Sequence, residues 1–375
     1  MSRFDDLVPE HIRALSLYSP GKPIRQAERE SGVRCIKLSS NENPLGPSPL
    51  ALKAMREAAD RVHFYPDNDA SELRQQLATR HNVPPEQILV TDGSTALLDI
   101  LARTLLGPGH NAVTSARSFI VYPIVTCATG ARLIEVPMRD DAYDLDAIAK
   151  AINRETRLVF LANPNNPTGT MFDAAATDAF LARMPDHVLV ALDEAYCDYA
   201  SDFARRHGME YSHSLDYVRA GRNVVVLRTF SKAHGLAGMR VGYGLGPAGL
   251  LQHLARVRTA FSVSALAEAA ALAALGDEAH VQRAIESNAA GVAWLLEKFR
   301  EMDVRAVPTS ANFIYFEAGE DAATLARRIQ AEGVIVRPLN AWGAPTALRV
   351  TVGTPEQNEL FVSALRKTLA RAAVR

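Results

Sequence analysis

The amino-acid sequence predicts an α/β protein, with a mostly parallel central sheet flanked by helices and a second, smaller α/β domain. Short apolar runs alternate with helical patterns along the chain. These runs are apolar throughout rather than at every second residue, which is typical of parallel strands covered on both faces. The length of 375 residues suits one large domain and one smaller domain.

The first strand and helix of the predicted sheet are "QILVT" and "TALLDILARTLL". The first segment is a short apolar run, which predicts a strand. In the second segment Leu97, Leu98, Leu101 and Leu105 recur at helical spacing. The "DGS" between them therefore marks the turn from a strand into a helix.

Three further apolar runs are spaced like successive strand–helix–strand units. They are "RLVFLA", "HVLVAL" and "NVVVL", which end near Ala162, Leu192 and Leu227. Each is followed by polar residues, in "NPNNPTG", "DEAY" and "TFSK". Because ligands of open α/β sheets bind beyond the carboxyl ends of the strands, we expect these motifs and "DGS" to meet at one crevice.

Changes of pattern along the chain predict three parts. Residues 1–45 contain "YSPGKP" and "LSSNENPLGPSP" and read as an irregular N-terminal arm, laid over the body or over a partner subunit. Residues 46–260 form the predicted large domain. Residues 261–375 form the predicted small domain, in which helical segments such as "HVQRAIESNAAGVAWLLEKF" precede mixed segments such as "ANFIYFE", "VIVRP" and "ALRVTVG".

The composition argues against several classes of partner and location. The formal net charge is −1, with basic residues dispersed, so no bulk attraction to nucleic acid or to an anionic membrane is expected. Three cysteines without a CxxC pair predict a reducing compartment. The start lacks a signal-peptide core, and the longest apolar tract, "VSALAEAAALAAL", is short and carries Glu268. We therefore expect a soluble cytoplasmic protein.

Two residues at strand ends indicate a particular chemistry. Lys232 follows one apolar run, and an amine in such a position becomes a nucleophile when its pKa is lowered. Asp193 ends another run, where a carboxylate is unfavourable unless it meets a cation. Taken alone, each has an ordinary alternative, a solvated lysine and a helix N-cap. An amine and a carboxylate facing one cavity suit pyridoxal 5'-phosphate, whose aldehyde takes a lysine and whose ring nitrogen takes an acid.

The remaining requirements of that cofactor can be matched in chain order. Its phosphate needs the start of a helix, hydroxyl groups and a cation. Its ring needs an aromatic side chain to stack on, and its phenolic oxygen needs hydrogen-bond donors. Singly these residues are also consistent with an N-cap, with core packing and with an Asn/Pro turn. The candidates are Gly93, Ser94, Thr95, Ser231 and Arg240 for the phosphate, Tyr122 for the ring, and Asn166 and Tyr196 for the oxygen.

Other chemistries find little support in the sequence. His207, His213 and Cys197 are too irregularly spaced to argue for zinc, so no metal is expected. The glycines of "GLAGMRVGYG" do not form a GxGxxG directly after a strand, and no GxSxG occurs.

Motifs spread from about residue 18 to residue 353 carry a resemblance to a known family. They are "IKLSSNENPLGPSP", "FYPD", "NPNNPTGT", "LDEAYCDY", "RTFSKAHGLAGMRVGY", "SANFIYF" and "LRVTVGT". On these motifs the chain resembles the fold-type I pyridoxal-phosphate-dependent transferases, and among them the histidinol-phosphate aminotransferase group.

The resemblance implies a role for each matching cofactor residue. Lys232 is similar to the lysine that forms the Schiff base and moves the catalytic proton, and Asp193 to the partner of the pyridinium nitrogen. Tyr196 and Asn166 are similar to the groups that hold the phenolic oxygen. Ser94, Thr95, Ser231 and Arg240 look like the phosphate cup. Tyr65 in "FYPD" resembles a tyrosine that reaches the cofactor phosphate of the neighbouring subunit, which implies a homodimer.

The resemblance also implies the substrates. Arg349 resembles the arginine that binds the acidic group of the substrate, Asn43 lies in the matching "NENP" segment, and Tyr18 and Arg337 match residues that contact the substrate phosphate. The implied reaction converts L-histidinol phosphate and 2-oxoglutarate to imidazole-acetol phosphate and L-glutamate, in histidine biosynthesis.

Three alternatives stay open on the sequence. An aromatic amino acid aminotransferase would keep the chemistry and change the substrate. A decarboxylase similar to threonine-phosphate decarboxylase would use the same lysine and aspartate. The third alternative, the cofactor-binding half of a transcription regulator, would need a basic DNA-reading module ahead of residue 1. We do not expect this class of protein.

Overall fold

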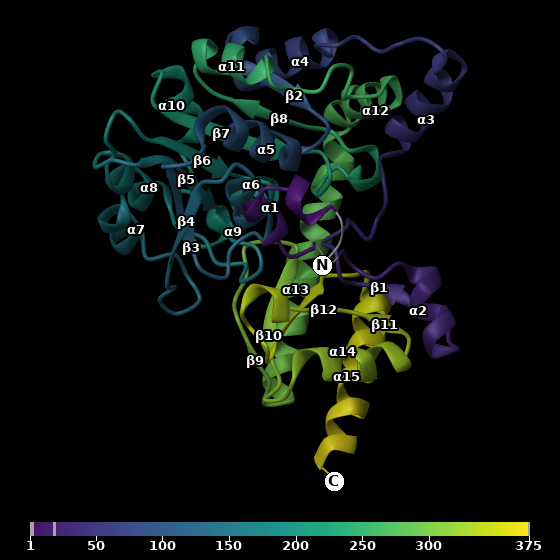
Figure 1. Ribbon diagram of the computed structural model, residues 1–375. Coiled ribbons are helices and arrows are strands. Elements are labelled where there is room, and N and C mark those ends of the chain that lie inside the picture. The colour runs from purple at the N-terminus through teal and green to yellow at the C-terminus, as the bar shows by residue number, and fades with distance from the viewer. Residues whose placement is uncertain (1–3, 18–19, 374–375) are drawn as a thin grey trace.

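The computed structural model describes residues 4–17 and 20–373. A large body built on a seven-stranded sheet joins a smaller body built on a four-stranded sheet, and the long helix α13 (Glu278–Glu301) runs into the smaller body (Figure 1). This arrangement confirms the α/β class and the mostly parallel sheet that the sequence predicts.

The large sheet has the strand order β2-β8-β7-β6-β5-β3-β4. Its strands from β7 to β4 run parallel, and β8 is antiparallel to both of its neighbours. The strands of this sheet are β2 (Ile88–Thr91), β3 (Asn111–Ser115), β4 (Arg132–Val136), β5 (Thr156–Ala162), β6 (Leu189–Asp193), β7 (Val224–Thr229) and β8 (Gly242–Leu245).

Successive side chains of these strands enter two separate cores, one on each face of the sheet. On β5, for example, Val159 lies in one core and Phe160 in the other. One face is covered by α5 (Ser94–Leu105), α6 (Val121–Ala128) and α11 (Ala248–Ala255). The other is covered by α3 (Pro49–Ala58), α4 (Ser71–His81), α7 (Leu145–Ala151), α8 (Ala174–Leu181), α10 (Ser214–Arg219) and α12 (Ala265–Leu275). Burial on both faces explains why these strands are continuous apolar runs.

Strand β8 fits into the sheet because it carries glycines where α5 lies close to it. A Cβ atom on Gly242 would lie 2.6 Å from the backbone nitrogen of Ser94, the first residue of α5. The start of α5 is thereby held against the end of the sheet.

The smaller body contains the antiparallel sheet β12-β13-β10-β9. Apolar residues of α13, α14 and α15 cover it. The arm joins this body, because β1 pairs in parallel with β11. The elements of this part are β1 (Ile36–Lys37), β9 (Arg305–Ala306), β10 (Phe313–Glu317), β11 (Val334–Ile335), β12 (Arg337–Pro338), β13 (Ala347–Thr351), α2 (Ile24–Ser31), α14 (Ala322–Ala331) and α15 (Pro355–Ala373).

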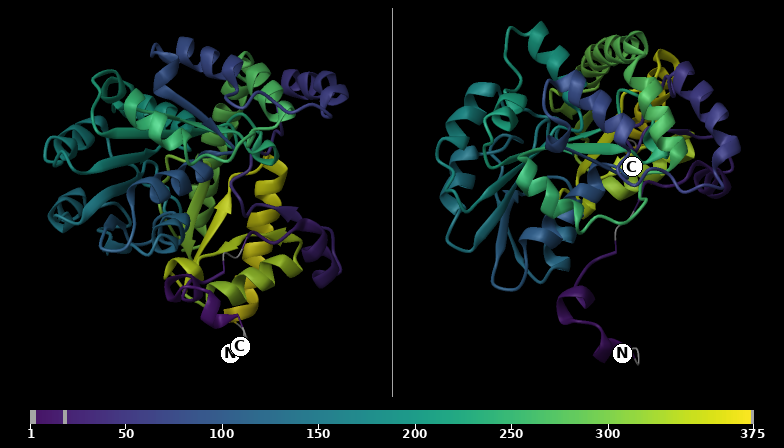
Figure 2. Two further views of the ribbon diagram at one scale, coloured as in Figure 1. Left: turned by 45° about the horizontal axis from the view of Figure 1, so that its top comes forward. Right: turned by 90° about the horizontal axis from the view of Figure 1, so that it is seen from above.

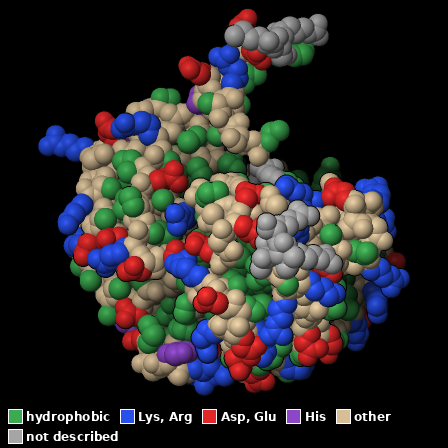
Figure 3. Space-filling view, turned by 90° about the horizontal axis from the view of Figure 1, so that it is seen from below, with side chains coloured by type: hydrophobic (Ala, Val, Ile, Leu, Met, Phe, Trp, Pro, Cys, Tyr) green, Lys and Arg blue, Asp and Glu red, His purple; other side chains and the backbone are tan. Residues whose placement is uncertain are grey.

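The division of the chain at residues 45 and 260 stays a prediction. Helix α12 bears on it, because its residues Ala267, Ala270 and Ala271 belong to the same apolar core as Leu73 of α4. The described residues 4–17, which include α1 (Glu10–Arg13), project from the body in the right-hand view of Figure 2. The face seen in Figure 3 carries basic and acidic side chains interspersed, in keeping with the balanced charge of the chain.

Candidate active site

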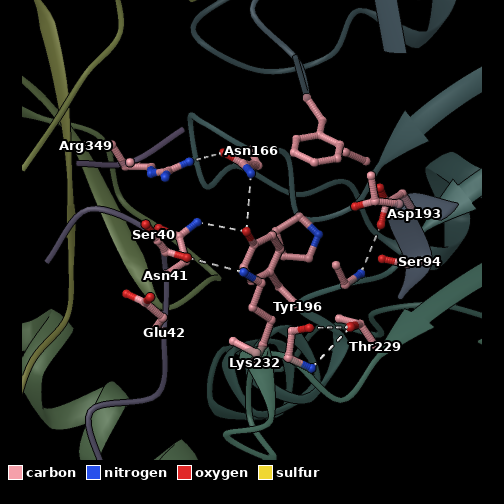
Figure 4. A pocket seen from close by; sticks show the side chains of 18 of the residues that line it. Ser40, Asn41, Glu42, Ser94, Asn166, Asp193, Tyr196, Thr229, Lys232 and Arg349 are labelled. Atoms are coloured by element: carbon pink, nitrogen blue, oxygen red, sulfur yellow. Dashed lines mark hydrogen bonds between the residues drawn. The ribbon is translucent and has the colours of Figure 1, made fainter. Parts of the chain in front are cut away.

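A cavity of about 250 Å³ lies at the carboxyl ends of β5, β6 and β7, and residues of the arm and of the smaller body complete its wall. Figure 4 shows this cavity with the side chains turned into it. The structure thus brings together residues that are far apart in the sequence. The predicted site residues that line it are Ser94, Thr95, Asn166, Asp193, Tyr196, Ser231, Lys232, Arg240, Arg337 and Arg349.

Lys232 lies in the turn after β7 and reaches the middle of the cavity. Its Nζ donates a hydrogen bond to the carbonyl of Ser40 at 3.5 Å and lies 5.4 Å from the ring centre of Tyr196. Burial, followed by the nearby positive charge of Arg349, lowers the pKa of Lys232 to about 8. A larger share of this amine is therefore unprotonated near neutral pH than of an exposed lysine, as a nucleophile requires.

Asp193 is the last residue of β6 and is almost fully buried. Its Oδ1 accepts a hydrogen bond from the backbone N–H of Ala195 at 3.3 Å, and its Oδ2 accepts one from the hydroxyl of Tyr122 at 3.0 Å. Burial raises the pKa of this carboxyl to about 6. A cation placed against Asp193 would stabilise its ionised form.

A chain of hydrogen bonds links the two bodies across the cavity. The hydroxyl of Tyr196 accepts from Asn41 Nδ2 at 2.8 Å and from Asn166 Nδ2 at 3.3 Å. The Oδ1 of Asn166 in turn accepts from Arg349, whose Nη2 donates to the carbonyl of Ser39 at 3.0 Å. Arg349 is buried and lies on β13, so the smaller body contributes a fixed guanidinium to the cavity (Figure 4).

The opposite end of the cavity has the features of an anion-binding site. Ser94 and Thr95 open α5, where backbone N–H groups are free of helical partners. Arg240 Nη1 donates to the hydroxyl of Ser231 at 3.3 Å. Gly93 precedes the helix with φ 103°, and a Cβ atom there would lie 2.5 Å from Arg240 Nη2. Only glycine suits this position, because the guanidinium lies directly against the backbone.

Some predicted site residues lie outside the cavity wall. Tyr65 has 83% of its surface exposed and packs against Phe261, with ring centres 4.8 Å apart and the ring planes tilted by 31°. Asn43 is buried, but its amide donates to the carbonyl of Ala233 at 2.8 Å and so ties the arm to the turn that carries Lys232. Tyr18 lies outside the described residues.

Tyr122 also differs from its predicted place. Its ring stacks on Phe160, with centres 4.7 Å apart, and it lies behind Asp193 rather than against the cavity. The aromatic residue of this segment that lines the cavity is Phe119, three residues earlier in the same "SFIVY" stretch. The geometry therefore gives Phe119 the position for which the sequence suggested Tyr122.

Sequence reasoning missed other wall residues as well. Asn41 and Ser40 lie two and three residues before Asn43, in the arm segment that the motif had singled out. Trp342 faces Arg337, whose guanidinium carbon lies 5.0 Å from the centre of its ring. A lone tryptophan after a short strand gave no signal of this contact.

Most of the chain, including the segments that form this cavity, matches a known family. Residues 33–365 match the family described as aminotransferase class I and II. The chain belongs to this aminotransferase family.

Relatives within the aminotransferase family are similar over nearly the full length of the chain. One is a histidinol-phosphate aminotransferase of Moorella thermoacetica, 47% identical over 96% of this chain and 92% of the relative. Another is histidinol-phosphate aminotransferase 2 of Pseudomonas aeruginosa, 45% identical over 99% of this chain and 100% of the relative. A solved structure, the Sinorhizobium meliloti histidinol-phosphate aminotransferase in complex with pyridoxal-5'-phosphate, has a TM-score of 0.87 at 30% identity, with 99% of each chain covered.

Within residues 4–17 and 20–373, no three His, Cys, Asp or Glu side chains cluster so as to hold a metal ion. In the same part of the chain, none of the helices is both long enough and apolar enough to span a membrane.

Proposed function

We propose that this aminotransferase binds pyridoxal 5'-phosphate and interconverts L-histidinol phosphate and 2-oxoglutarate with imidazole-acetol phosphate and L-glutamate, in histidine biosynthesis. The observation that carries the proposal is the meeting of Lys232, Asp193 and the anion-binding start of α5 in one cavity. The names of the full-length relatives support the choice of substrate.

The residues present fit the cofactor. The start of α5, Ser231 and Arg240 offer hydrogen-bond donors for a phosphate. Because Gly93 has no side chain, the guanidinium of Arg240 can lie directly against the backbone at the start of the helix. Phe119 offers an aromatic wall. When bound, pyridoxal phosphate supplies an aldehyde that captures amines and a ring that accepts the electron pair left when a carbon loses its proton.

The side chains of this protein would have distinct parts in the reaction. Lys232 would hold the cofactor through its amine, and its Nζ would move the proton of the reacting carbon as general acid and base. Asp193 would place a negative charge beside the ring nitrogen, which favours the protonated form of that nitrogen. Tyr196 and Asn166 hydrogen-bond the phenolic oxygen.

Two buried arginines of the smaller body would bind the substrates. Arg349 clamps the carboxylate of glutamate in one half-reaction and the phosphate of histidinol phosphate in the other, since a planar guanidinium suits both groups. Arg337 adds charge for a second anionic group.

We propose further that two copies form a cytoplasmic homodimer. Val62, Phe64, Tyr65 and Phe261 form an exposed apolar patch around a surface hollow, and each of them exposes 44% or more of its surface. Covering this patch by a second copy would remove apolar surface from water. The resemblance of "FYPD" implies that Tyr65 would then reach the partner's cofactor phosphate.

The experiment that tests the function compares three amino donors with 2-oxoglutarate as acceptor. We expect kcat/KM for histidinol phosphate to exceed that for phenylalanine, and threonine phosphate to release no carbon dioxide. Preference for phenylalanine would favour an aromatic aminotransferase, and carbon dioxide release would favour a decarboxylase. Either result would contradict the proposed substrate.

A further inference from the structure

Tyr122 is fixed in place behind the cavity wall. It lies on α6, its side chain is fully buried, and its ring is parallel to that of Phe160, with an angle of 6° between the two planes. The ring of Phe119 packs edge-on against it, with centres 5.7 Å apart. These two contacts hold the hydroxyl of Tyr122 in one direction.

That direction is toward Asp193. The hydroxyl donates to Asp193 Oδ2 at 3.0 Å, whereas Oδ1 accepts from the backbone N–H of Ala195. Asp193 itself lines the cavity. The carboxylate is therefore held on one side by Tyr122, which does not line the cavity, and on the other by the backbone of Ala195, which does.

The groups around Tyr122 and Asp193 keep the hydroxyl of Tyr122 protonated, so that it acts as a neutral hydrogen-bond donor. Burial and the neighbouring carboxylate of Asp193 raise the pKa of Tyr122 well above its ordinary value, so its hydroxyl stays protonated. Tyr143 and Tyr196 face the same region from other elements, Lys232 faces Asp193 across the cavity, and Glu194 follows it in the chain. A hydrogen bond from a neutral donor favours the ionised carboxylate over the protonated one.

We infer that Tyr122 is a positioning residue that holds Asp193 ionised and correctly turned to pair with the ring nitrogen of the cofactor. This inference rests on the proposed function, since it requires pyridoxal phosphate in the cavity. Tyr122 does not line the cavity, so its effect on the cofactor would pass through Asp193.

The test measures cofactor affinity of the full cofactor-free protein, rather than activity. The probes are pyridoxal phosphate and an analogue in which carbon replaces the ring nitrogen. Tyr122→Phe keeps the stacked ring and removes only the hydroxyl. We expect it to raise the Kd for pyridoxal phosphate about tenfold or more, as for loss of a hydrogen bond to a charged group, and to change the Kd for the analogue less than about twofold.

A matched control is Tyr143→Phe, which removes a neighbouring phenol that bonds Ser118 and the backbone N–H of Ala162 instead of Asp193. It should leave the ratio of the two Kd values unchanged. In an Asp193→Asn background, adding Tyr122→Phe should cause no further loss, and thermal unfolding of each variant verifies that it folds.

Three results would overturn the inference: an unchanged Kd for pyridoxal phosphate in Tyr122→Phe, an equal loss for both probes, or a full further loss in the Asp193→Asn background. A wild-type protein that binds no pyridoxal phosphate would instead contradict the proposed function. The two failures are thus distinguishable.

Discussion

Arg349 contacts both the arm and the large body, because its guanidinium donates to the carbonyl of Ser39 and to Asn166. Arg349→Lys keeps the positive charge but loses the planar pair of donors. We expect KM for glutamate and for histidinol phosphate to rise about tenfold or more, the effect of about 1.4 kcal/mol of lost binding free energy. Steady-state kinetics would measure this. Unchanged KM values for both substrates would remove Arg349 from the proposed substrate site.

Asp193 should make the stability of the cofactor-free protein depend on pH. Its folded pKa of about 6 lies above the ordinary value of 3.8, so the folded state binds the proton more tightly. This contribution to stability is present at low pH and is lost as the pH rises from about 4 to about 6, which amounts to about 3 kcal/mol for a shift of this size.

Urea unfolding of the cofactor-free wild type and of Asp193→Asn over that pH range would measure this contribution. The variant should gain stability relative to the wild type as the pH rises through the window. A constant difference between the two proteins would contradict the raised pKa.

At the residue scale, sequence motifs located the site but not every contact in it. Lys232 and Asp193 could be predicted because each follows an apolar strand. Tyr122 and Phe119 stand three residues apart in one segment, and only the packing of α6 decides which ring faces the cavity. The sequence likewise does not decide whether Asn43 or Asn41 lines the cavity, because the path of an irregular arm follows from its tertiary contacts rather than from a repeating pattern.

At the scale of elements, a buried ion pair joins the ends of β6 and β7. Glu194 is almost fully buried and accepts from Arg228 Nη2 at 2.7 Å and Nε at 3.0 Å. Ser212 donates to its other oxygen at 2.8 Å. Glu194 directly follows Asp193, and Arg228 lies four residues before Lys232. The ion pair therefore fixes the two strand ends that carry Asp193 and Lys232.

Removing one member of this pair should be costly. Arg228→Met leaves a buried carboxylate without its cation and should lower the free energy of unfolding by about 3–5 kcal/mol. The double variant Arg228→Met with Glu194→Leu should recover most of this loss, because no charge is left buried. Urea denaturation would measure both, and a loss below about 1 kcal/mol in the single variant would show that the pair contributes little.

The parallel strands were the most predictable elements, because burial on both faces makes each one a continuous apolar run. The pairing of β1 with β11 could not be read in this way, because each strand has two residues and their partners are almost three hundred positions apart. The antiparallel direction of β8 likewise depends on its tertiary neighbours, in particular on the close approach of α5 to Gly242.

At the scale of the whole molecule, the proposed homodimer, in which Tyr65 reaches the partner's cofactor phosphate, predicts that each site needs two chains. Lys232→Ala and Tyr65→Ala should each inactivate or strongly impair the homodimer. In a hybrid of the two variants, one site would combine an intact Lys232 with an intact Tyr65 of the other chain. Random pairing makes about half of the dimers hybrids, so about one quarter of wild-type activity should return.

Co-expression of the two variants with different affinity tags, followed by purification on both tags, would isolate these hybrids for assay. Variants with Phe64→Glu should sediment as monomers and provide the control. Hybrids that are no more active than their parents would contradict a site shared between subunits.

The central claim is tested most directly by one half-reaction. Purified protein loaded with pyridoxal phosphate is mixed with histidinol phosphate alone, while the visible absorbance of the bound cofactor is recorded. We predict that this absorbance falls in the absence of an acceptor, returns when 2-oxoglutarate is added, and shows no such cycle with Lys232→Ala. If the absorbance does not change with histidinol phosphate but falls with phenylalanine, the proposed substrate is contradicted. If it changes with neither compound, the protein is not a transaminase of these donors.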